Sequence, residues 1–459
     1  MSTPAAPISE QAPQGLQPSP PWQPTQLPDV SVDTLVIGAG ISGLGFRGFW
    51  RDVGGAGSVL VVDKSSAPGG YCKTVKQDGF VWDYSGHFFH FRFKDLEQRL
   101  VSRMAPGSVQ TIVKRSRVLD VEGCETGFPY QACIGELPAA AFQSCLLDLW
   151  QAEQQRSTSP SSPSLSFKEM LVARLGRSIC ERFLVPYNEK LDATDLDALD
   201  AECMGRFFPS TTFADVMKGL SGATGQGGYN ATFTYPRGGA VEYVNALLQD
   251  LGVGELALNE GVSAIDLETR IATTTKRRIR FGRLITSAPL PQTLQACSLP
   301  HQAQVFSSNR VLVFNLGFDA KGRDDVHWLY CASPTLPFYR VGFYDNIFGD
   351  DRMSLYVEIG LESRGDVDVE SWKAQVLRGL VEAGIVTQQK LVSWHAVVMD
   401  PAYVHITPGS LSETSRRRAE LEQAGVFSMG RYGGWTYCSI EDNLIEARAL
   451  AQRLVAGRS

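Results

Sequence analysis

The stretch TLVIGAGISGLGFRGF at residues 34–49 decides the fold of this chain. A mostly apolar run, typical of a buried strand, leads into Gly38, Gly40 and Gly43, and apolar residues at helical spacing follow. The first glycine allows a tight turn, the second lets backbone amides approach a pyrophosphate, and the third lets the helix pack on the strand. The N-terminus of that helix attracts the negative phosphates. The stretch therefore predicts a Rossmann-type dinucleotide-binding unit.

A second strand and a second pair of glycines extend this unit. SVLVVDK at 58–64 ends in Asp63, whose carboxylate we expect to accept hydrogen bonds from an adenosine ribose. The Gly69-Gly70 doublet that follows resembles FAD oxidoreductases of the glutathione-reductase and amine-oxidase type, so the dinucleotide implied is FAD. ITSAPL at 285–290 is predicted as a further strand of the same domain. No second GxGxxG follows an apolar strand, so we expect no separate NAD(P)H domain and an external electron donor.

Composition argues against several classes of protein. The net charge of −6 gives no global basic field for nucleic acid, and no apolar run reaches the roughly 20 residues of a membrane span. The nine cysteines never form a CxxC pair, which predicts reduced thiols, no metal site and, with no signal peptide in front, a cytoplasmic protein. Residues 1–30 hold eight of the 24 prolines and no Lys or Arg, which predicts a disordered tail.

Beyond the glycine turn, helical and strand patterns alternate. The predicted fold class is α/β, a Rossmann-type FAD-binding domain with an inserted helical lobe and an antiparallel β-sheet substrate domain. Helices are predicted at 137–152, 167–185, 190–220 and 442–456, and strands at 262–267, 279–290, 311–318 and 354–361. The expected domains are FAD-binding segments at 31–95, 237–305 and 409–459, a mainly helical substrate lobe at 96–236 with an exposed insertion at 154–166, and the sheet domain at 306–408.

Five further stretches resemble one family of flavoproteins, the UDP-galactopyranose mutases, over most of residues 33–457. They are WDYSGHFFHF at 82–91, VPYNEKL at 185–191 with CMGRFF at 203–208, WLY at 328–330 with PFYR at 337–340, DPAYVHITP at 400–408, and GRYGGWTYCSIEDNLIEA at 430–447. FPYQ at 128–131 is a weaker match. The family's usual tryptophan after the lysine of the second stretch is absent, and Leu191 and Asp192 stand there instead.

The resemblance implies roles for particular residues. His87 would lie by the flavin N5, with His90 nearby, and would tune flavin protonation or relay a proton as a group that titrates near neutrality. Arg206 and Arg340 would clamp the substrate diphosphate, because a bidentate guanidinium suits a pyrophosphate. The remaining substrate-binding residues implied are Phe128, Tyr187, Asn188, Lys190, Tyr330, Tyr403 and Tyr437. The cofactor-binding residues are Gly38, Gly40, Ile41, Ser42, Gly43, Asp63, Lys64, Gly70, Tyr71, Gly86, His87, Val262, Gly430, Arg431, Tyr437, Asp442 and Asn443.

The resemblance also implies a redox-neutral reaction of a redox cofactor. Reduced FAD would attack the anomeric carbon of a nucleotide sugar through N5, form a flavin–sugar adduct, and interconvert pyranose and furanose forms of UDP-galactose or a related sugar nucleotide. Such a product serves cell-surface polysaccharide synthesis, and a homo-oligomer is compatible with the sequence. The alternative is an FAD oxidase or desaturase of the amine-oxidase or protoporphyrinogen-oxidase type, which would have no use for arginines and tyrosines around a diphosphate. A third alternative, a flavin-stabilised sugar-nucleotide binding protein without activity, would require a missing reactive residue.

Overall fold

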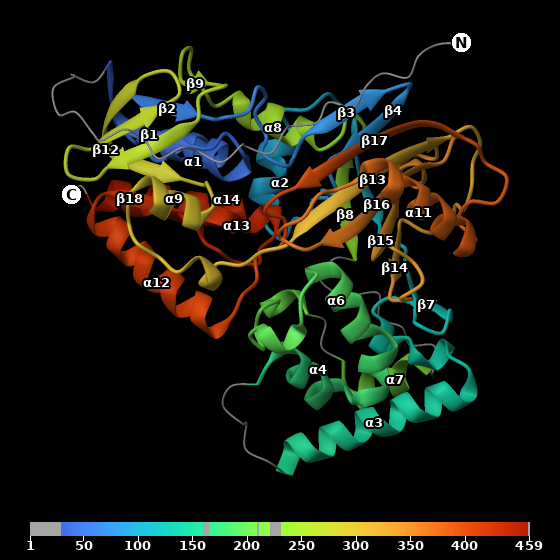
Figure 1. Ribbon diagram of the computed structural model, residues 1–459. Helices are drawn as coiled ribbons and strands as arrows, with labels where there is room; N and C mark the ends of the chain where they lie inside the picture. Colours follow the sequence, from blue (N-terminus) through green and yellow to red (C-terminus); the bar gives the residue numbers. More distant parts are fainter. Residues whose placement is uncertain (1–28, 159–164, 209–210, 221–230, 458–459) are drawn as a thin grey trace.

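A computed structural model describes residues 29–158, 165–208, 211–220 and 231–457, which form two sheet domains and a helical lobe (Figure 1). Most of the predicted proline-rich tail and the centre of the predicted insertion at 154–166 lie outside the described residues. Within the described residues, no helix is both long enough and apolar enough to cross a membrane. All nine cysteines are free thiols, as expected.

The first sheet is built around the predicted dinucleotide-binding strands. Its order is β10-β11-β12-β1-β2-β9, and β18 pairs with the C-terminal end of β12. The strands are β1 (Val30–Ile37), β2 (Val59–Val62), β9 (Leu256–Ala257), β10 (Val262–Asp266), β11 (Ile271–Thr274), β12 (Arg278–Thr286) and β18 (Val426–Ser428). β1 lies between β2 and β12 and runs parallel to both, so Ile285 and Thr286 of the predicted ITSAPL strand belong to the same sheet, whereas the strand ends there and a helix begins at Leu290.

Alternate residues of these strands face two different cores. Val36, Val61 and Ile285 pack with the apolar faces of three helices, whereas Leu35 and Leu284 face the opposite side. The three helices are α1 (Ile41–Asp52), α8 (Val241–Leu248) and α14 (Ile440–Ala456). Shorter segments complete this domain, namely α9 (Leu290–Ala296), α12 (Pro408–Gln423) and α13 (Gly430–Gly433). Three distant parts of the sequence contribute to this domain, so the domain is discontinuous.

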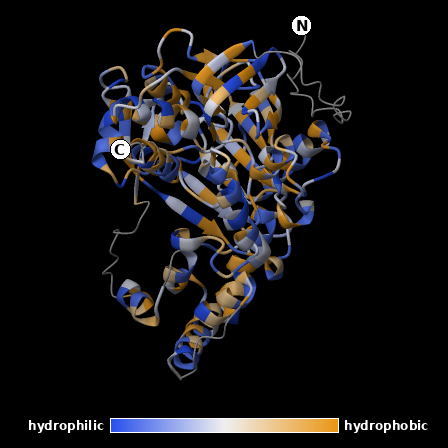
Figure 2. Ribbon diagram, turned by 90° about the vertical axis from the view of Figure 1, so that its left-hand side faces the viewer, coloured by the Kyte–Doolittle hydropathy of each residue, from blue (hydrophilic) through white to orange (hydrophobic). Residues whose placement is uncertain are grey.

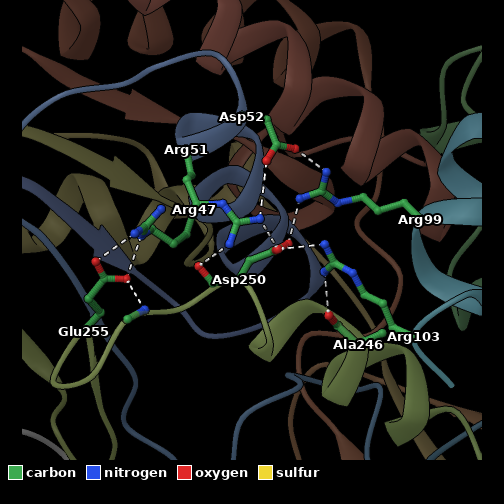
Figure 3. Close-up of polar contacts among 9 residues, drawn as sticks. Arg47, Arg51, Asp52, Arg99, Arg103, Ala246, Asp250 and Glu255 are labelled. Carbon is green, nitrogen blue, oxygen red and sulfur yellow. Dashed lines mark hydrogen bonds and ion pairs between the residues drawn. The ribbon is translucent and has the colours of Figure 1, made fainter.

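An ion-pair network fixes the C-terminal end of α1 (Figure 3). Asp250 is buried, and its carboxylate pairs with Arg51 at 2.6 Å, Arg99 at 2.7 Å and Arg103 at 2.8 Å. Arg99 belongs to α2 (Lys94–Val101). A buried charge is tolerated when it is paired and hydrogen-bonded in this way. The network therefore joins α1, α2 and the end of α8 at the opposite end of α1 from the glycine turn.

The second sheet carries the elements predicted for the substrate domain. Its order is β17-β13-β16-β15-β14-β6-β7. The strands are β6 (Ser116–Leu119), β7 (Glu125–Gly127), β13 (Arg310–Phe318), β14 (Trp328–Cys331), β15 (Arg340–Phe343), β16 (Ser354–Leu361) and β17 (Leu391–Met399). One face packs on α11 (Val369–Glu382) through residues such as Leu355 and Val357, and the short α10 (Asp345–Phe348) precedes β16. The alternate residues Tyr356 and Glu358 therefore point away from α11.

Segment 96–236 is less uniformly helical than expected. Its strands β6 and β7 join the second sheet, and the β6–β14 pairing is parallel, so this sheet is not purely antiparallel. Its helix α2 packs on α8 of the first domain through Leu96 and Leu100. Two small antiparallel pairs lie between the sheets, β3 (Thr74–Gln77) with β4 (Phe80–Asp83), and β5 (Val109–Val113) with β8 (Thr232–Pro236).

The helical lobe itself contains α3 (Ala139–Thr158), α4 (Phe167–Leu175), α5 (Arg177–Ile179), α6 (Val185–Asp192) and α7 (Phe213–Leu220). The single helix predicted at 167–185 is broken at Gly176, whose φ of +80° is a conformation that favours glycine. A π-helical segment at Cys180–Leu184 then leads into α6 just before Pro186, which lacks the amide for a regular helical hydrogen bond. α3 carries both hydrophilic and hydrophobic residues along its length (Figure 2), and Leu147 and Trp150 are exposed on it.

Candidate active site

The glycine turn between β1 and α1 has the geometry that its sequence predicts. Gly38 has a φ of +101°, and a Cβ on Gly43 would lie 1.9 Å from the carbonyl oxygen of Gly38. Gly40 is the N-cap of α1 and provides no side-chain cap, while Ile41 and Ser42 form the first turn. The first-turn amides of α1 are therefore free of side-chain capping by Gly40 and suit an anion.

Asp63 holds this turn from the end of β2. Its Oδ2 accepts a hydrogen bond from the amide of Ala39 at 2.7 Å, and its Oδ1 accepts one from Ser65 at 2.8 Å. The amide of Gly69 donates to the carbonyl of Ala39 at 2.8 Å, so the glycine doublet lies against the first glycine turn. A Cβ on Gly40 would lie 3.8 Å from the Cα of Gly70. The two glycine-rich segments thus meet without side chains between them.

The N-terminal ends of α1, α13 and α14 meet at Asn443. The amide oxygen of Asn443 accepts hydrogen bonds from the hydroxyl of Ser42 and from the backbone amide of Arg431, both at 2.9 Å. Gly430 has a φ of +79°, and a Cβ there would lie 2.4 Å from the hydroxyl oxygen of Ser42. Four predicted cofactor residues from three segments of the chain are therefore in contact.

Two further predicted cofactor residues directly follow residues of this region in the chain, Tyr71 after Gly70 and Lys64 after Asp63. The hydroxyl of Tyr71 accepts a hydrogen bond from the amide of Asp400 at 2.9 Å, and its ring meets that of Tyr432. Lys64 lies beside Gly261, which precedes Val262 at the start of β10.

The loop that contains His87 is tightly packed against the second sheet. A Cβ on Gly86 would lie 2.3 Å from the hydroxyl oxygen of Tyr356, so only glycine fits there. The hydroxyl of Ser85 donates to the carboxylate of Glu358. His87 therefore has a fixed position between the two sheet domains.

The electrostatic environment of His87 differs from the expectation of a group titrating near neutrality. Burial lowers the pKa of His87 to about 4, Glu358 partly opposes this shift, and the positive charges of Arg431 and Arg340 add to it. Its Nδ1 is buried and has no hydrogen-bond partner among the described residues. Burial also lowers the pKa of His90 to about 4, and its Nδ1 lies 2.7 Å from the carbonyl oxygen of Thr232. Both rings are therefore neutral at pH 7.

Arg340 occupies the middle of a row of three polar side chains across the second sheet. Strand register places Tyr330 of β14 opposite Arg340 of β15, and Arg340 opposite Glu358 of β16. The Nε of Arg340 lies 2.5 Å from Oε2 of Glu358, whose side chain is fully buried. In the adjacent row, the indole of Trp328 donates to the hydroxyl of Tyr356 across the bare backbone of Gly342. Cross-strand packing therefore fixes the guanidinium of Arg340.

Glu358 is a functional candidate that sequence reasoning missed. The signal was present, since SLYVEIGL at 354–361 places one carboxylate in an otherwise apolar strand. A fully buried acid needs a charged partner, and that partner is the predicted Arg340.

Aromatic rings line this row on the side of the helical lobe. Phe128 stacks on Tyr330 with ring centroids 4.9 Å apart, and Tyr187 meets Tyr330 edge-on at 5.7 Å. The positive charge of Arg340 lies close enough to Tyr187 to oppose the burial that raises the pKa of this tyrosine. Three residues predicted from separate stretches are thus brought together around Arg340.

A second aromatic group surrounds Arg431. Tyr403 and Tyr437 are stacked with centroids 6.1 Å apart, and the guanidinium of Arg431 lies 5.2 Å and 4.9 Å from their respective rings. The Nε of Arg431 is buried and has no hydrogen-bond partner in the part of the chain that the structure describes. A guanidinium held by aromatic faces retains its ability to bind an anion.

Asp192 faces this second group and was noted from the sequence only as a replacement for tryptophan. Burial raises the pKa of Asp192 to about 7, and the positive charge of Arg431 opposes the shift. Its carboxylate also contributes to raising the pKa of Tyr437, which burial dominates. A carboxylate therefore lies beside Arg431, which was predicted to bind the cofactor.

Two residues of the VPYNEKL stretch, which were predicted to bind substrate, make hydrogen bonds within the protein. The ammonium of Lys190 donates to the carbonyls of Cys331, Ser333 and Leu336 at 3.0–3.1 Å, which uses all three of its hydrogens. The amide nitrogen of Asn188 donates to the carbonyl of Leu184 at 2.6 Å within its own helix, and the residue is buried. Lys190 therefore links α6 to the end of β14 and the loop after it, whereas the bond of Asn188 stays within its own helix.

Arg206 lies at the edge of the second aromatic group, the one around Arg431, and not inside it. Its guanidinium contacts both carboxylate oxygens of Asp442 at 2.5 Å, and Arg92 pairs with the same carboxylate at 2.7 Å. The ring of the neighbouring Phe207 meets Tyr437 at 5.1 Å. Arg206 lies over the ring of Phe207, whereas Arg340 lies over the rings of Tyr339 and Tyr356, and each of the two guanidinium groups has an acid partner. Among the described residues, no group of three or more His, Cys, Asp and Glu side chains is arranged to hold a metal ion.

Comparison with known proteins agrees with this architecture. A family model described as an NAD(P)-binding Rossmann-like domain matches residues 36–103. A solved reduced UDP-galactopyranose mutase superposes with a TM-score of 0.85 at 21% identity, covering 93% of this chain and 94% of that one. A protein described as a putative protoporphyrinogen oxidase from Exiguobacterium sp. 255-15 gives 0.72 at 16%, with 94% and 99% covered. A wild-type putrescine oxidase bound to putrescine gives 0.63 at 17%, with 93% and 99% covered.

These identities establish a likeness of fold. The expected fold class, a Rossmann-type domain with a helical lobe and a second sheet domain, is confirmed, and so is the expected resemblance at the level of the fold. The chain has a Rossmann-like NAD(P)-binding domain and, over nearly its whole length, the fold of a UDP-galactopyranose mutase.

Proposed function

We propose that the protein is an FAD-dependent nucleotide-sugar mutase that interconverts pyranose and furanose forms of UDP-galactose or a related sugar nucleotide. The observation that carries this proposal is the group of arginine and tyrosine side chains near His87. Arg340 and Arg431 lie near His87, and tyrosines from four different segments surround them. A site for amine oxidation has no need for such groups, whereas a diphosphate leaving group does.

The residues present fit a bound FAD. The uncapped N-terminus of α1 and the two side-chain-free glycine segments suit a pyrophosphate, and Asp63 has carboxylate lone pairs for a ribose. Nδ1 of His87 and Nε of Arg431 are buried polar atoms without a partner among the described residues, and a buried polar atom ordinarily has one. Both atoms would therefore be available to hold a bound FAD.

In the proposed reaction, a bound reduced flavin supplies a nucleophilic nitrogen for the anomeric carbon of the sugar. The guanidinium groups of Arg340 and Arg431 bind the diphosphate, stabilise its charge as it departs, and hold it for its return. Tyr330, Tyr403 and Tyr437 contribute neutral hydroxyl donors. The imidazole of His87 is neutral at pH 7, so it holds one proton and can accept a second at the other ring nitrogen.

Glu358, the acid paired with Arg340, tunes the binding of the diphosphate. Glu358 compensates the charge of Arg340 in the absence of substrate, so the guanidinium does not stand alone in a buried site. The Nε of Arg340 donates to Glu358, and the other two nitrogens of this guanidinium remain for a phosphate. Arg340 is thus both fixed in position and able to bind.

The test is incubation of the dithionite-reduced protein with UDP-galactofuranose, followed by chromatography for a pyranose product. Other nucleotide sugars are tried if no product forms, and NAD(P)H replaces dithionite to test an external donor. Mutase activity requires prior reduction and consumes no reductant per turnover. Oxygen consumption in proportion to an oxidised product would instead identify the oxidase alternative, whose fold the putrescine oxidase shares.

A further inference from the structure

Lys114 lies in the link between β5 and β6, beside the aromatic rings that line Arg340. Its Nζ is 4.7 Å from the ring centroid of Phe128, 5.1 Å from that of Trp328 and 5.8 Å from that of Tyr330. A lysine ammonium within about 6 Å of an aromatic centroid is attracted to the ring. The side chain is half-buried, and three rings, two from strand β14 and one from the loop after β7, fix its position.

The charge of Lys114 has no acidic partner over the ranges that the structure describes. Its only hydrogen bond from Nζ goes to the hydroxyl of Tyr330 at 3.4 Å, so two of its three hydrogens meet no protein acceptor there. Residues 221–230, which precede its backbone partner Ala231, contain no Asp or Glu in the sequence. An uncompensated cation beside a candidate substrate site points to an anionic ligand.

Two other lysines show what a purely structural role looks like in this protein. Lys190 donates to three backbone carbonyls, and so leaves no hydrogen for a ligand. Lys373 also lies over a ring, at 3.8 Å from the centroid of Trp394, but it pairs with Glu370 at 2.5 Å. Lys114 differs from both because its charge and its donors remain available.

The position of Lys114 separates it from the groups proposed to bind the diphosphate. Tyr330 lies between Lys114 and Arg340, because Tyr330 is opposite Arg340 in the strand register and also accepts the hydrogen bond from Lys114. On the other side, the charge of Lys114 contributes to the lowered pKa of His90, which burial dominates. Lys114 therefore faces the end of the site near the histidine loop, and the two arginines already suffice for one diphosphate.

We propose that Lys114 binds an anionic substituent on the sugar of the substrate, and that the preferred substrate is therefore a nucleotide sugar acid. This inference rests on the proposed function and specifies its substrate class. A sugar carboxylate is planar, carries one charge, and would accept the two free hydrogens of the ammonium, while the apolar face of the sugar would pack on Phe128. The aromatic rings exclude water from one side of the ammonium, which strengthens such a pair.

The experiment is anaerobic titration calorimetry of the reduced full-length protein with UDP, UTP, UDP-galactose and UDP-galacturonate. The wild type is expected to bind UDP-galacturonate roughly ten- to hundredfold more tightly than UDP-galactose, the range expected for one charge-assisted contact. Lys114→Met should lose this preference and keep the affinities for UDP and UDP-galactose within about twofold. Lys114→Arg should retain the preference, since it keeps the charge, and Lys373→Met should behave as the wild type.

Each other outcome overturns the inference in a recognisable way. Equal affinity of the wild type for the neutral and acidic sugars, or an equal loss on all four ligands in Lys114→Met, would overturn it and leave the mutase proposal standing. A loss confined to UTP would identify the ligand of Lys114 as a nucleotide phosphate, and would likewise contradict a sugar acid. If Lys114→Met does not fold, Lys114→Arg decides through retention of the preference. A wild type that binds none of these ligands overturns both proposals.

Discussion

Arg340 and Glu358 form a buried ion pair between adjacent strands of the second sheet, with Nε of the arginine 2.5 Å from Oε2 of the glutamate. The hydroxyl of Ser85, two residues before His87, donates to the other carboxylate oxygen. One carboxylate thus connects the histidine loop with the arginine most central to the candidate site. The consequences of this arrangement can be measured.

Removal of the carboxylate charge should destabilise the protein and leave ligand binding intact. Glu358→Gln leaves the guanidinium of Arg340 buried without a counter-charge, and we expect the free energy of unfolding to fall by about 3 kcal/mol in urea titrations. Because Arg340 gains free charge, affinity for UDP-galactose should not decrease. The matched control is Glu260→Gln, which breaks the buried pair with Arg277 in the first sheet and should lose stability without any change in affinity.

The two predicted clamp arginines should differ in their effects. Arg340→Ala should weaken binding of UDP-galactose about a hundredfold, because this guanidinium is central and fixed. Arg206→Ala should weaken it by about tenfold or less, because Arg206 is about one-third exposed and paired with Asp442. Titration of the flavin absorbance measures both, and both variants should remain yellow. A larger loss in Arg206→Ala than in Arg340→Ala would contradict this order.

Asp192 should control the pH dependence of substrate affinity near neutrality. Its pKa is raised to about 7, so above that pH its negative charge opposes an anionic substrate next to Arg431. Affinity for UDP-galactose, whose diphosphate does not titrate in this range, should rise several-fold from pH 8 to pH 6. The Asp192→Asn variant should bind UDP-galactose tightly, with an affinity that does not depend on pH.

The same substitution should change stability with a definite sign. Because the folded pKa of Asp192 lies above the unfolded value, its stabilising contribution is present below about pH 4 and is lost as the pH rises through 7. Asp192→Asn should therefore be more stable than the wild type at pH 8, by roughly 1–4 kcal/mol. Equal stability of the two proteins at pH 8 would show that the carboxylate is not desolvated.

His87 should affect acid stability and not the activity profile between pH 6 and 8. Its folded pKa of about 4 lies below the value of 6.5 for a free histidine, so the unfolded state binds the proton between these pH values. Its contribution to stability is present above pH 6.5 and is lost as the pH falls towards 4. Urea unfolding at pH 7 and pH 5 should show a smaller loss for His87→Gln than for the wild type.

Lys190 should prove structural despite its place in a family-like motif. Lys190→Met leaves the carbonyls of Cys331, Ser333 and Leu336 without their donor, and should lower the free energy of unfolding by about 3 kcal/mol. The folded fraction should retain its affinity for UDP-galactose, as measured by titration at low temperature. Lys168→Met, at an exposed ion pair on α4, is the control and should change stability by less than 1 kcal/mol.

The sequence predicts the dinucleotide-binding half of the molecule well because its determinants are local. The turn at Gly38, Gly40 and Gly43 depends on short-range steric limits, and these limits are readable from residue type and spacing. Strand periodicity likewise predicts β10, β12, β13 and β16 within a few residues. The break at Gly176 was missed because helical spacing of apolar residues continues on both sides of it.

The sequence predicted which residues belong to the candidate site better than it predicted how those residues contact one another. Motif resemblance selected Arg340, Tyr330 and His87, and the structure brings them together. It could not select Glu358 or Asp192, whose importance comes from burial beside arginines on other elements. Nor could it foresee that Lys190 donates to backbone carbonyls while Lys114 has no acid partner among the described residues, because both facts depend on how distant segments pack.

The sequence by itself determined the glycine turn, the strand–turn–helix–strand unit around it and the residue types that an anionic ligand requires, since these depend on neighbours within a few positions. Only the tertiary structure decided which charges are compensated. Desolvation and pairing act between side chains that lie far apart in the sequence, and they set the neutral state of His87, the raised pKa of Asp192 and the available charge of Lys114.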